Sequence, residues 1–418
     1  MTFSIPSLLR RISANPAAAE TVTPEQRRLI NRYVAGSVRE RQAKIATLRA
    51  AGKLRSARRK QSEMLSSLTA RLEAANRASR KSRPRQGVSR GFQEIWRVAQ
   101  ALRSMQKPAS PFVRLKQKRT GGIRPICQFG LEDRARQYLM RSALNPFVGI
   151  LPAQYGLRRG RSAACEALLQ AMGTAPSDDV FVQVDIRGFY SAIAHEWLEE
   201  NLPLPRGVIP TVIHTGGMRM VPRRLARPVG EAIRELGRRG IPQGSAASSL
   251  VAEFVVADIL RGMADLLQGS LVVNYSDNIG LLMHRETWEA RAIVEPLRRA
   301  LLAHPAGPFE TTMSRPRPIT MPFKFLGYCW IKGNAGAHAY VDPEALDERV
   351  TLYRSELDLY ASVGSEEALR HLQRTRAKAA SYASAFALCP ETQQRVREIL
   401  DESRELIWDP APPSVIPR

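Results

Sequence analysis

Two aspartates, each at the end of an apolar run typical of a β-strand, are the residues best placed to do chemistry in this sequence. Asp185 follows the apolar residues 180–184, and Asp277 lies about 90 residues further on in residues 274–280, which read NYSDNIG. Carboxylates on neighbouring strands are suitable oxygen ligands for two divalent cations about 3.5 to 4 Å apart. Such a metal pair supports nucleotidyl transfer, because it activates a hydroxyl and stabilises a leaving pyrophosphate. Taken alone, either aspartate would also suit a turn or a helix cap.

Other motifs accompany the two aspartates in a definite order between residues 115 and 328. In chain order the series comprises a basic hairpin at 111–129, residues 155–162 (YGLRRGRS), the Asp185 strand, residues 240–245 (GIPQGS), the Asp277 string and residues 325–328 (FLGY). This series resembles the reverse transcriptase family, and most closely the bacterial branch that includes group II intron and retron enzymes. The resemblance covers about half of the chain. It implies an α+β fold of the right-hand polymerase type, with fingers, palm and thumb.

The resemblance implies that Asp185, Asp277 and the backbone carbonyl of Ile186 ligate Mg²⁺. The family normally has a second aspartate directly after the first in its Tyr-x-Asp-Asp string, and this sequence has Asn278 there. Asparagine keeps an oxygen ligand but has one negative charge fewer, so we expect Asn278 to stay in the catalytic set with a weaker metal affinity. A second departure lies at residues 314–317, where a Lys-Thr pair is common and Ser-Arg-Pro-Arg stands instead, so that Arg315 can replace the lysine.

Four further residues are implied to bind the incoming nucleotide. Lys116 and Arg124 on the basic hairpin would hold its triphosphate, because cations offset the charge that grows on phosphates during transfer. Tyr190 would lie beneath the sugar and leave no room for a 2′-hydroxyl, so deoxynucleotides are selected by exclusion. Gln243, between glycines that allow close approach of the backbone, would hydrogen-bond near the template base and nucleotide.

Several other residues of these motifs have weaker predictions. On the hairpin, Lys118 and Arg119 are expected to be solvated, and residues 120–122 to form its tight turn. Arg158 and Arg161 are expected to contact phosphate. Residues 325–328 are implied to grip the 3′ end of the primer, although four apolar or small residues are equally typical of a core.

Positive charge is concentrated at the N-terminal end of the chain. The sequence of 418 residues has a formal net charge of +24, and its first 100 residues hold 22 lysines and arginines against 6 acidic residues, a balance of +16. An excess on this scale favours a polyanionic partner such as nucleic acid. A solvated helix face is the alternative for any single cluster.

Helix and linker signals divide the chain into three predicted domains. A basic helical N-terminal extension covers 1–89, with helices at 24–50 and 54–78 and a linker at 80–89 that makes the extension removable. Fingers and palm cover 90–340. A helical thumb covers 341–418, with helices starting near 342, 365 and 390.

Composition also excludes several classes of protein. The four cysteines, at positions 127, 165, 329 and 389, form no Cys-x-x-Cys pair, so a zinc site or disulfide framework is not expected. No apolar run approaches the roughly 20 residues that span a bilayer, and the N-terminus has the wrong charge order for a secretory signal. We therefore expect a soluble cytoplasmic protein with no membrane contact.

The sequence predicts an RNA-directed DNA polymerase that uses Mg²⁺ and deoxynucleotides. It resembles the stand-alone bacterial reverse transcriptases often linked to phage defence, which work with a dedicated noncoding RNA as template partner and yield a DNA product. Two alternatives remain open. A catalytically weak RNA-binding scaffold with a polymerase fold is favoured by Asn278, and an RNA-synthesising polymerase or primase is disfavoured by Tyr190. The template, the primer and the oligomeric state are not predicted.

Overall fold

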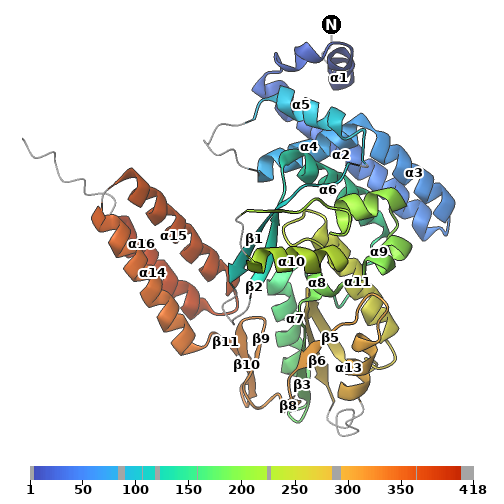
Figure 1. Cartoon of the computed structure of the whole chain (residues 1–418). Coiled ribbons are helices and arrows are strands. Elements are labelled where there is room, and N and C mark those ends of the chain that lie inside the picture. The colour runs from blue at the N-terminus through green and yellow to red at the C-terminus, as the bar shows by residue number, and fades with distance from the viewer. Residues whose placement is uncertain are drawn as a thin grey trace, which may run out of the picture. The chain divides into compact units, whose positions relative to one another are not determined.

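The computed structural model of the chain consists of two compact units, each built from three separate segments (Figure 1). It describes residues 4–82, 90–105, 107–117, 123–157, 159–223, 227–284, 293–363 and 365–405. Unit 1 comprises Met1–Leu151, Ile186–Met263 and Leu297–Thr311. Unit 2 comprises Pro152–Asp185, Ala264–Pro296 and Thr312–Arg418.

Unit 1 begins with a helical region that packs on helix α6 (Leu131–Leu144). The N-terminal elements are α1 (Ile5–Ala14), η1 (Pro16–Ala19), α2 (Pro24–Ala50), α3 (Leu54–Ser66), α4 (Leu68–Lys81) and α5 (Phe92–Ala101). The predicted first helix is confirmed, and it starts at a capping box in which Thr23 and Gln26 satisfy each other's backbone N–H groups. The predicted second helix is wrong in its extent. It breaks at Ser67, whose extended backbone ends α3 and whose hydroxyl caps α4.

A small three-stranded sheet with the order β2-β1-β4 follows in unit 1. The predicted hairpin is confirmed as β1 (Phe112–Gln117) paired antiparallel with β2 (Ile123–Gln128), whereas its turn and Lys118 and Arg119 lie outside the described residues. Strand β4 (Val221–Pro222) and helix α10 (Arg227–Arg238) complete this layer. Its core contains Val113, Cys127 and Leu236.

The remaining elements of unit 1 are short, apart from one apolar helix. That helix is α11 (Ser248–Gly262). The others are η2 (Asn145–Phe147), α8 (Phe189–Ala192), α9 (His195–Asn201), η3 (Arg206–Val208), η4 (Ile209–Ile213) and α13 (Val294–Leu302).

Unit 2 is built on a five-stranded sheet whose central strand carries Asp185. The order is β5-β6-β3-β7, with β8 also paired to β3. The strands are β3 (Val180–Ile186), β5 (Leu271–Tyr275), β6 (Asn278–Met283), β7 (Thr311–Met313) and β8 (Arg317–Pro318). Helix α7 (Gly160–Thr174) packs on β5. Apolar side chains of β3, β5 and α7 share one core, which includes Phe181, Val273 and Leu168.

A second sheet and a helical bundle complete unit 2. The sheet has the order β11-β10-β9, formed by β9 (Phe323–Phe325), β10 (Tyr328–Gly333) and β11 (Gly336–Tyr340). The bundle consists of α14 (Pro343–Val363), α15 (Glu366–Ala385) and α16 (Pro390–Glu405), which start where the acidic first turns predicted. The predicted α+β fold with a helical N-terminal region is therefore confirmed. Within the described residues, none of the helices has both the length and the hydrophobicity needed to cross a bilayer.

Candidate active site

Asp185 and Asn278 lie directly opposite each other on neighbouring antiparallel strands. Strand β3 pairs with β6 in a register that joins Val184 to Ile279 and Asp185 to Asn278. Side chains of opposed residues share one face of a sheet, with Cβ atoms about 4.5 to 5.5 Å apart. Both residues are half-buried. The family position at which an aspartate is expected therefore faces Asp185, and here it presents a neutral amide.

Asp277 projects from a two-residue turn between β5 and β6. Tyr275 pairs with Asn278 across the hairpin, so Ser276 and Asp277 alone form the loop. Ser276 has φ of +58°, a left-handed conformation that is unfavourable for a residue other than glycine and needs support from its surroundings. The amide of Asn278 donates to Oδ1 of Asp277 at 3.4 Å. This contact brings the two side chains of the turn together.

Asn274 holds this turn in place, a role that the sequence did not predict. Its side chain is fully buried, and its Nδ2 donates to the backbone carbonyl of Ser276 at 2.9 Å and to that of Asn278 at 3.1 Å. Its own backbone N–H and carbonyl bond to Ala153 and Tyr155. The sequence did contain a signal for this role, because asparagine in a strand is unusual and side-chain amides often cap tight turns. Asn274 thus fixes the backbone on both sides of Asp277.

The donor set of this turn suits a hard divalent cation. Asp185 and Asp277 offer carboxylate oxygens, Asn278 offers an amide oxygen, and Ile186 ends strand β3 with a backbone carbonyl. Mg²⁺ prefers oxygen ligands of this type and is usually held by one or two carboxylates together with substrate phosphates. Across the described ranges no group of three or more His, Cys, Asp or Glu side chains is gathered as a metal cluster. The residues therefore fit a cation that shares its coordination with substrate.

The predicted nucleotide-binding residues belong to unit 1, where hydrogen bonds connect their segments. Residues 240–247 form a loop that we call the GIPQGS loop. Its Ile241 N–H donates to the carbonyl of Tyr190 at 2.8 Å, and its Gln243 carbonyl accepts from Cys127 N–H of β2 at 2.8 Å. The segments of Tyr190 and Gln243 and the basic hairpin are thus bonded to one another.

Glycines make these close approaches possible. Gly240 has φ of +101°, and a Cβ there would lie 2.9 Å from the carbonyl oxygen of Tyr190. Gly244 has φ of +109°, and a Cβ there would fall on the carbonyl oxygen of Cys127. Any other residue would force the loop away from both neighbours, because left-handed backbone and close packing coincide at these positions.

Helix α6 holds the far end of the same loop. Oε1 of Gln137 accepts from Ala246 N–H at 3.0 Å, and the guanidinium of Arg141 donates to the Ala246 carbonyl at 2.9 Å and to Ser249 Oγ at 3.2 Å. Burial lowers the pKa of Arg141, which nevertheless stays charged because an arginine pKa begins above 12. The loop is therefore bonded to β2, α6 and the Tyr190 turn.

Tyr190 lies at the start of the chain's turn away from strand β3. Gly188, with φ of +57°, begins the short helix α8, and the Tyr190 ring packs at 90° against Phe189 with ring centroids 6.1 Å apart. Phe189 is almost fully buried and packs on Phe309, so it is a core residue as expected. Tyr190 is half-buried, which leaves part of its ring available to a ligand.

Lys116 and Arg124 are directly opposite each other on the hairpin and both are exposed. Opposed like charges repel across a strand pair, so the hairpin presents a cationic pair that an anion would stabilise. Val113 and Cys127, another opposed pair, point into the core instead. Burial raises the pKa of Cys127 to about 12, so this thiol is a packing group.

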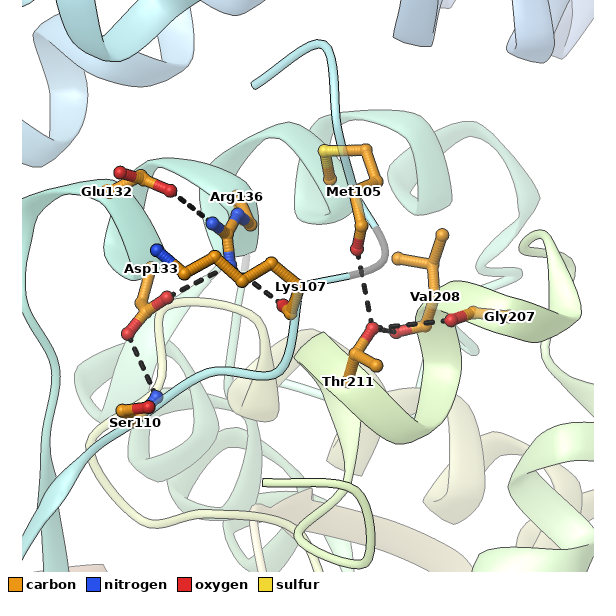
Figure 2. A network of polar contacts seen from close by, with 9 residues as sticks. All are labelled: Met105, Lys107, Ser110, Glu132, Asp133, Arg136, Gly207, Val208 and Thr211. Carbon is orange, nitrogen blue, oxygen red and sulfur yellow. Dashed lines mark hydrogen bonds and ion pairs between the residues drawn. The ribbon is translucent and has the colours of Figure 1, made fainter. Parts of the chain in front are cut away.

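A buried polar network anchors the segment that leads into this hairpin (Figure 2). Arg136 of α6 is only 1% exposed, pairs with Glu132 and Asp133, and donates to the Lys107 carbonyl at 2.9 Å. The other carboxylate oxygen of Asp133 accepts from Ser110 N–H at 3.2 Å. A buried arginine requires such partners, and here they fix the entry to β1 onto α6.

The FLGY and YGLRRGRS motifs meet at the edge of the second sheet of unit 2. Leu326 and Gly327 both have positive φ, +49° and +82°, as the tightest hairpin turns require. The guanidinium of Arg161 stacks over the rings of Tyr328 and Phe386, 5.5 and 4.7 Å from their centroids, and donates to the Ala385 carbonyl. Arg161 therefore has a structural role, and its phosphate contact stays a prediction. Arg158 lies outside the described residues.

The predicted site residues thus form two groups, one in each unit. Asp185, Asp277 and Asn278 cluster in unit 2. The second group is held by unit 1 and consists of Lys116, Arg124, Tyr190 and Gln243.

Comparisons with known proteins identify the segment that carries most of these motifs. The profile of the family described as "Reverse transcriptase (RNA-dependent DNA polymerase)" matches residues 115–305. A search of curated proteins found no match. Among solved structures, a telomerase from Candida albicans in complex with the TWJ fragment of telomeric RNA is similar to this chain, with 13% sequence identity and a TM-score of 0.36. The match covers 72% of this chain and 61% of the telomerase chain. The chain thus spans about three fifths of that telomerase, and so distant a likeness assigns no residue a role.

The matched segment contains both aspartates, the cationic hairpin pair, Tyr190 and the GIPQGS loop. Residues 115–305 of this chain therefore match the reverse transcriptase family.

Proposed function

We propose that the chain is an RNA-directed DNA polymerase that transfers deoxynucleotides with Mg²⁺. The observation that carries this proposal is the strand register that sets Asp185 opposite Asn278, with Asp277 in the adjoining turn. Asp185, Asp277 and the Ile186 carbonyl would hold the cation, with the Asn278 oxygen as a weaker neighbour. When bound, Mg²⁺ would neutralise phosphate charge and favour ionisation of the attacking hydroxyl.

The chain's own side chains would supply binding and selection. Lys116 and Arg124 would take the triphosphate, since their opposed positions give two cations on one exposed face. Tyr190 would exclude the 2′-hydroxyl, and Gln243 would contact the base pair being formed. Each role is supported by the family match and by the bonds that tie the segments of Tyr190 and Gln243 to each other.

Replacing Asp185 tests the polymerase proposal. Asp185→Asn keeps the shape of the side chain but removes its charge, so primer extension should slow by at least about 100-fold, or roughly 3 kcal/mol of transition-state stabilisation. Asp178→Asn is the matched control, because Asp178 is an exposed carboxylate just before the same strand and should leave the rate unchanged. Wild-type extension retained by Asp185→Asn would contradict the proposal.

Asn278 supports the second candidate, an RNA-binding scaffold with weak catalysis. The amide bonds to Asp277 and adds no negative charge opposite Asp185, so metal affinity would be lower than with a second aspartate. Asn278→Asp should lower the magnesium concentration for half-maximal extension if the enzyme is active. If extension is undetectable in the wild type and appears only in Asn278→Asp, the scaffold is the better description.

The biological partner is proposed as a dedicated noncoding RNA, with a role in phage defence. Support comes from the motif resemblance to stand-alone bacterial relatives and from the basic N-terminal region. Sequencing the nucleic acid that copurifies with the protein tests this. Recovery of one defined RNA and its complementary DNA is expected, and random cellular RNA alone would contradict it.

A further inference from the structure

Two stacked histidines lie beneath the first residue of the GIPQGS loop, and neither belongs to a motif of the domain. The ring centroids of His195 and His214 are 3.9 Å apart and the ring planes differ by 13°. His195 is 7% and His214 is 2% exposed. All residues that contact the pair belong to unit 1.

The hydrogen bonds define which nitrogen of each ring carries the proton. Nε2 of His195 lies 2.9 Å from the Gly240 carbonyl, which can only accept, so this nitrogen carries hydrogen. Nδ1 of His214 accepts from Gly216 N–H at 3.1 Å, so its Nε2 donates to Glu199 Oε1 at 2.9 Å. Each ring therefore uses its neutral form, and a second proton on His214 would cost the bond that its Nδ1 accepts from Gly216 N–H.

The carbonyl that His195 holds belongs to the residue that anchors the loop. Gly240 donates its N–H to the Ile193 carbonyl at 2.8 Å, and Ile241 donates to the Tyr190 carbonyl at 2.8 Å. The Thr215 hydroxyl lies 3.0 Å from the Gly240 carbonyl, but it has one proton and is closer to the Leu236 carbonyl. The peptide between Gly240 and Ile241 is thus fixed on one side by His195 and on the other by the backbone of Tyr190.

We propose that His195, supported by His214, is a positioning residue that sets the GIPQGS loop against the Tyr190 backbone and thereby maintains sugar selection. The inference rests on the proposed function of Tyr190, and the loop geometry is its independent part. His195 touches no reacting atom. It acts through the Gly240 carbonyl. That carbonyl belongs to the same peptide group as the Ile241 N–H, which donates to the Tyr190 carbonyl.

Burial and mutual repulsion oppose charge on the pair, although the bond to the Gly240 carbonyl by itself favours a charged His195. Desolvation lowers the pKa of His195 and lowers the pKa of His214 to about 4, and each ring's positive charge would oppose the other's. Glu196 and Glu199 favour protonation while Arg239 opposes it at His195, but burial is the largest cause for both rings. The unfolded chain takes up these protons near pH 6.5, so the stabilisation is complete above that pH and is lost as pH falls toward about 4.

Hydrogen exchange of the full-length protein tests the positioning without depending on activity. After correction for intrinsic exchange, the Gly240 and Ile241 amides should be protected at pH 7.5. As the pH is lowered, they should lose this protection before the amides in the middle of α6 do. His195→Ala should speed their exchange about tenfold at neutral pH, as loss of one buried hydrogen bond predicts. His195→Gln can still donate to the Gly240 carbonyl and cannot take up a proton, so it should keep protection at pH 7.5. The loss of protection in acid, here called the acid step, should change because only His214 of the pair can still take up a proton.

Two further variants separate the pair from general effects. His304→Gln is the matched control, since His304 is also partly buried with a pKa lowered by burial but contacts Asp258 and Trp197 instead of the loop. It should leave the acid step unchanged. Gly216→Ala should reproduce the faster exchange, because its Cβ would lie 2.8 Å from Nδ1 of His195 and 3.1 Å from Cε1 of His214.

The second readout is the ratio of deoxynucleotide to ribonucleotide incorporation at pH 7.5. It should fall in His195→Ala and recover in His195→Gln. Unchanged exchange in His195→Ala, or faster exchange of these amides in His195→Gln at pH 7.5, would overturn the positioning role. If His195→Ala does not fold, exchange in the wild type and in His195→Gln at pH 7.5 decides the question. Altered exchange with an unaltered ratio would overturn the link to Tyr190. Altered exchange in a protein with no polymerase activity would instead count against the proposed function.

Discussion

Position 278 shows how one residue changes the electrostatics of a metal-binding turn. An aspartate there would put a third carboxylate beside Asp185 and Asp277, and closely spaced anions destabilise one another until a cation binds. The amide of Asn278 instead donates to Asp277. The turn of this chain is therefore better suited to persist without metal than one with a second aspartate would be.

The ring of Tyr190 should decide which sugar is used. Tyr190→Ala removes the steric exclusion, so incorporation of ribonucleotides should rise at least about tenfold relative to deoxynucleotides. Tyr190→Phe keeps the ring and should keep the preference. Incorporation assays with matched nucleotide pairs measure this, and equal ratios in the wild type and Tyr190→Ala would place the discrimination elsewhere.

Asn274 should stabilise the turn that carries Asp277. Asn274→Ala removes two hydrogen bonds at a fully buried position, so the free energy of unfolding should fall by about 2 kcal/mol. Extension should also slow, because Ser276 loses support for its left-handed backbone. Denaturant unfolding measures the first effect. The control is Asn201→Ala, which removes one bond to the Trp197 carbonyl at an exposed helix end and should cost less than about 0.5 kcal/mol.

Among the elements, helix α6 connects the N-terminal helices to the residues proposed to bind the nucleotide. Its buried Arg136 fixes the entry to β1, while Gln137 and Arg141 hold the end of the GIPQGS loop. Helix α4 packs along α6, and the two share the interior of unit 1. The N-terminal helices are therefore part of the support of this loop.

Gln61 joins α3 to this support and should be important for stability. Its Nε2 donates to the Ala143 carbonyl at 3.0 Å and to the Pro203 carbonyl at 2.6 Å, and the side chain is 3% exposed. Gln61→Met keeps the volume but leaves both carbonyls without this donor, so unfolding should become easier by about 2 kcal/mol. Gln42→Met removes a single bond, to the Ser142 carbonyl, and should cost about half as much. Thermal or denaturant unfolding measures both variants. Equal losses of unfolding free energy in Gln61→Met and Gln42→Met would contradict this account.

At the scale of the whole molecule, the basic N-terminal region is better tested by substitution than by deletion. Helices α2 to α4 bury Ile30, Val34, Met64 and Leu72, so removing them would expose the apolar face of α6. We therefore expect loss of the first 82 residues to destabilise unit 1, in contrast to the removable extension that the linker composition predicts.

Charge on α2 should contribute to RNA affinity through counterion release. Arg28, Arg32 and Arg39 are exposed and spaced to lie on one face of the helix. Replacing all three with glutamine should reduce the slope of log affinity against log salt by about 0.7 for each lost contact to single-stranded RNA. The triple lysine variant keeps the charge and should keep the slope. An unchanged slope in the glutamine variant would show that this face does not contact RNA.

The sequence by itself determined those features that depend on near neighbours in the chain. The start of the helix at residue 24, the paired strands of the hairpin and the starts of the three C-terminal helices follow from local backbone preferences and hydrogen bonds within a few residues. The order of the motifs was enough to indicate the family resemblance, because each motif is local and the spacing between motifs can be read directly from the sequence.

Tertiary structure alone decided which distant polar groups meet. Gln61 bonds to a carbonyl 142 residues away, His195 to one 45 residues away, and Arg161 to one 224 residues away. A buried glutamine, a stacked histidine and a structural arginine have the same local sequence signature as solvated ones, because only packing removes their water and gives each a partner. Gln61, His195 and the structural role of Arg161 were for this reason invisible in the sequence, while the residues proposed to do the chemistry were not.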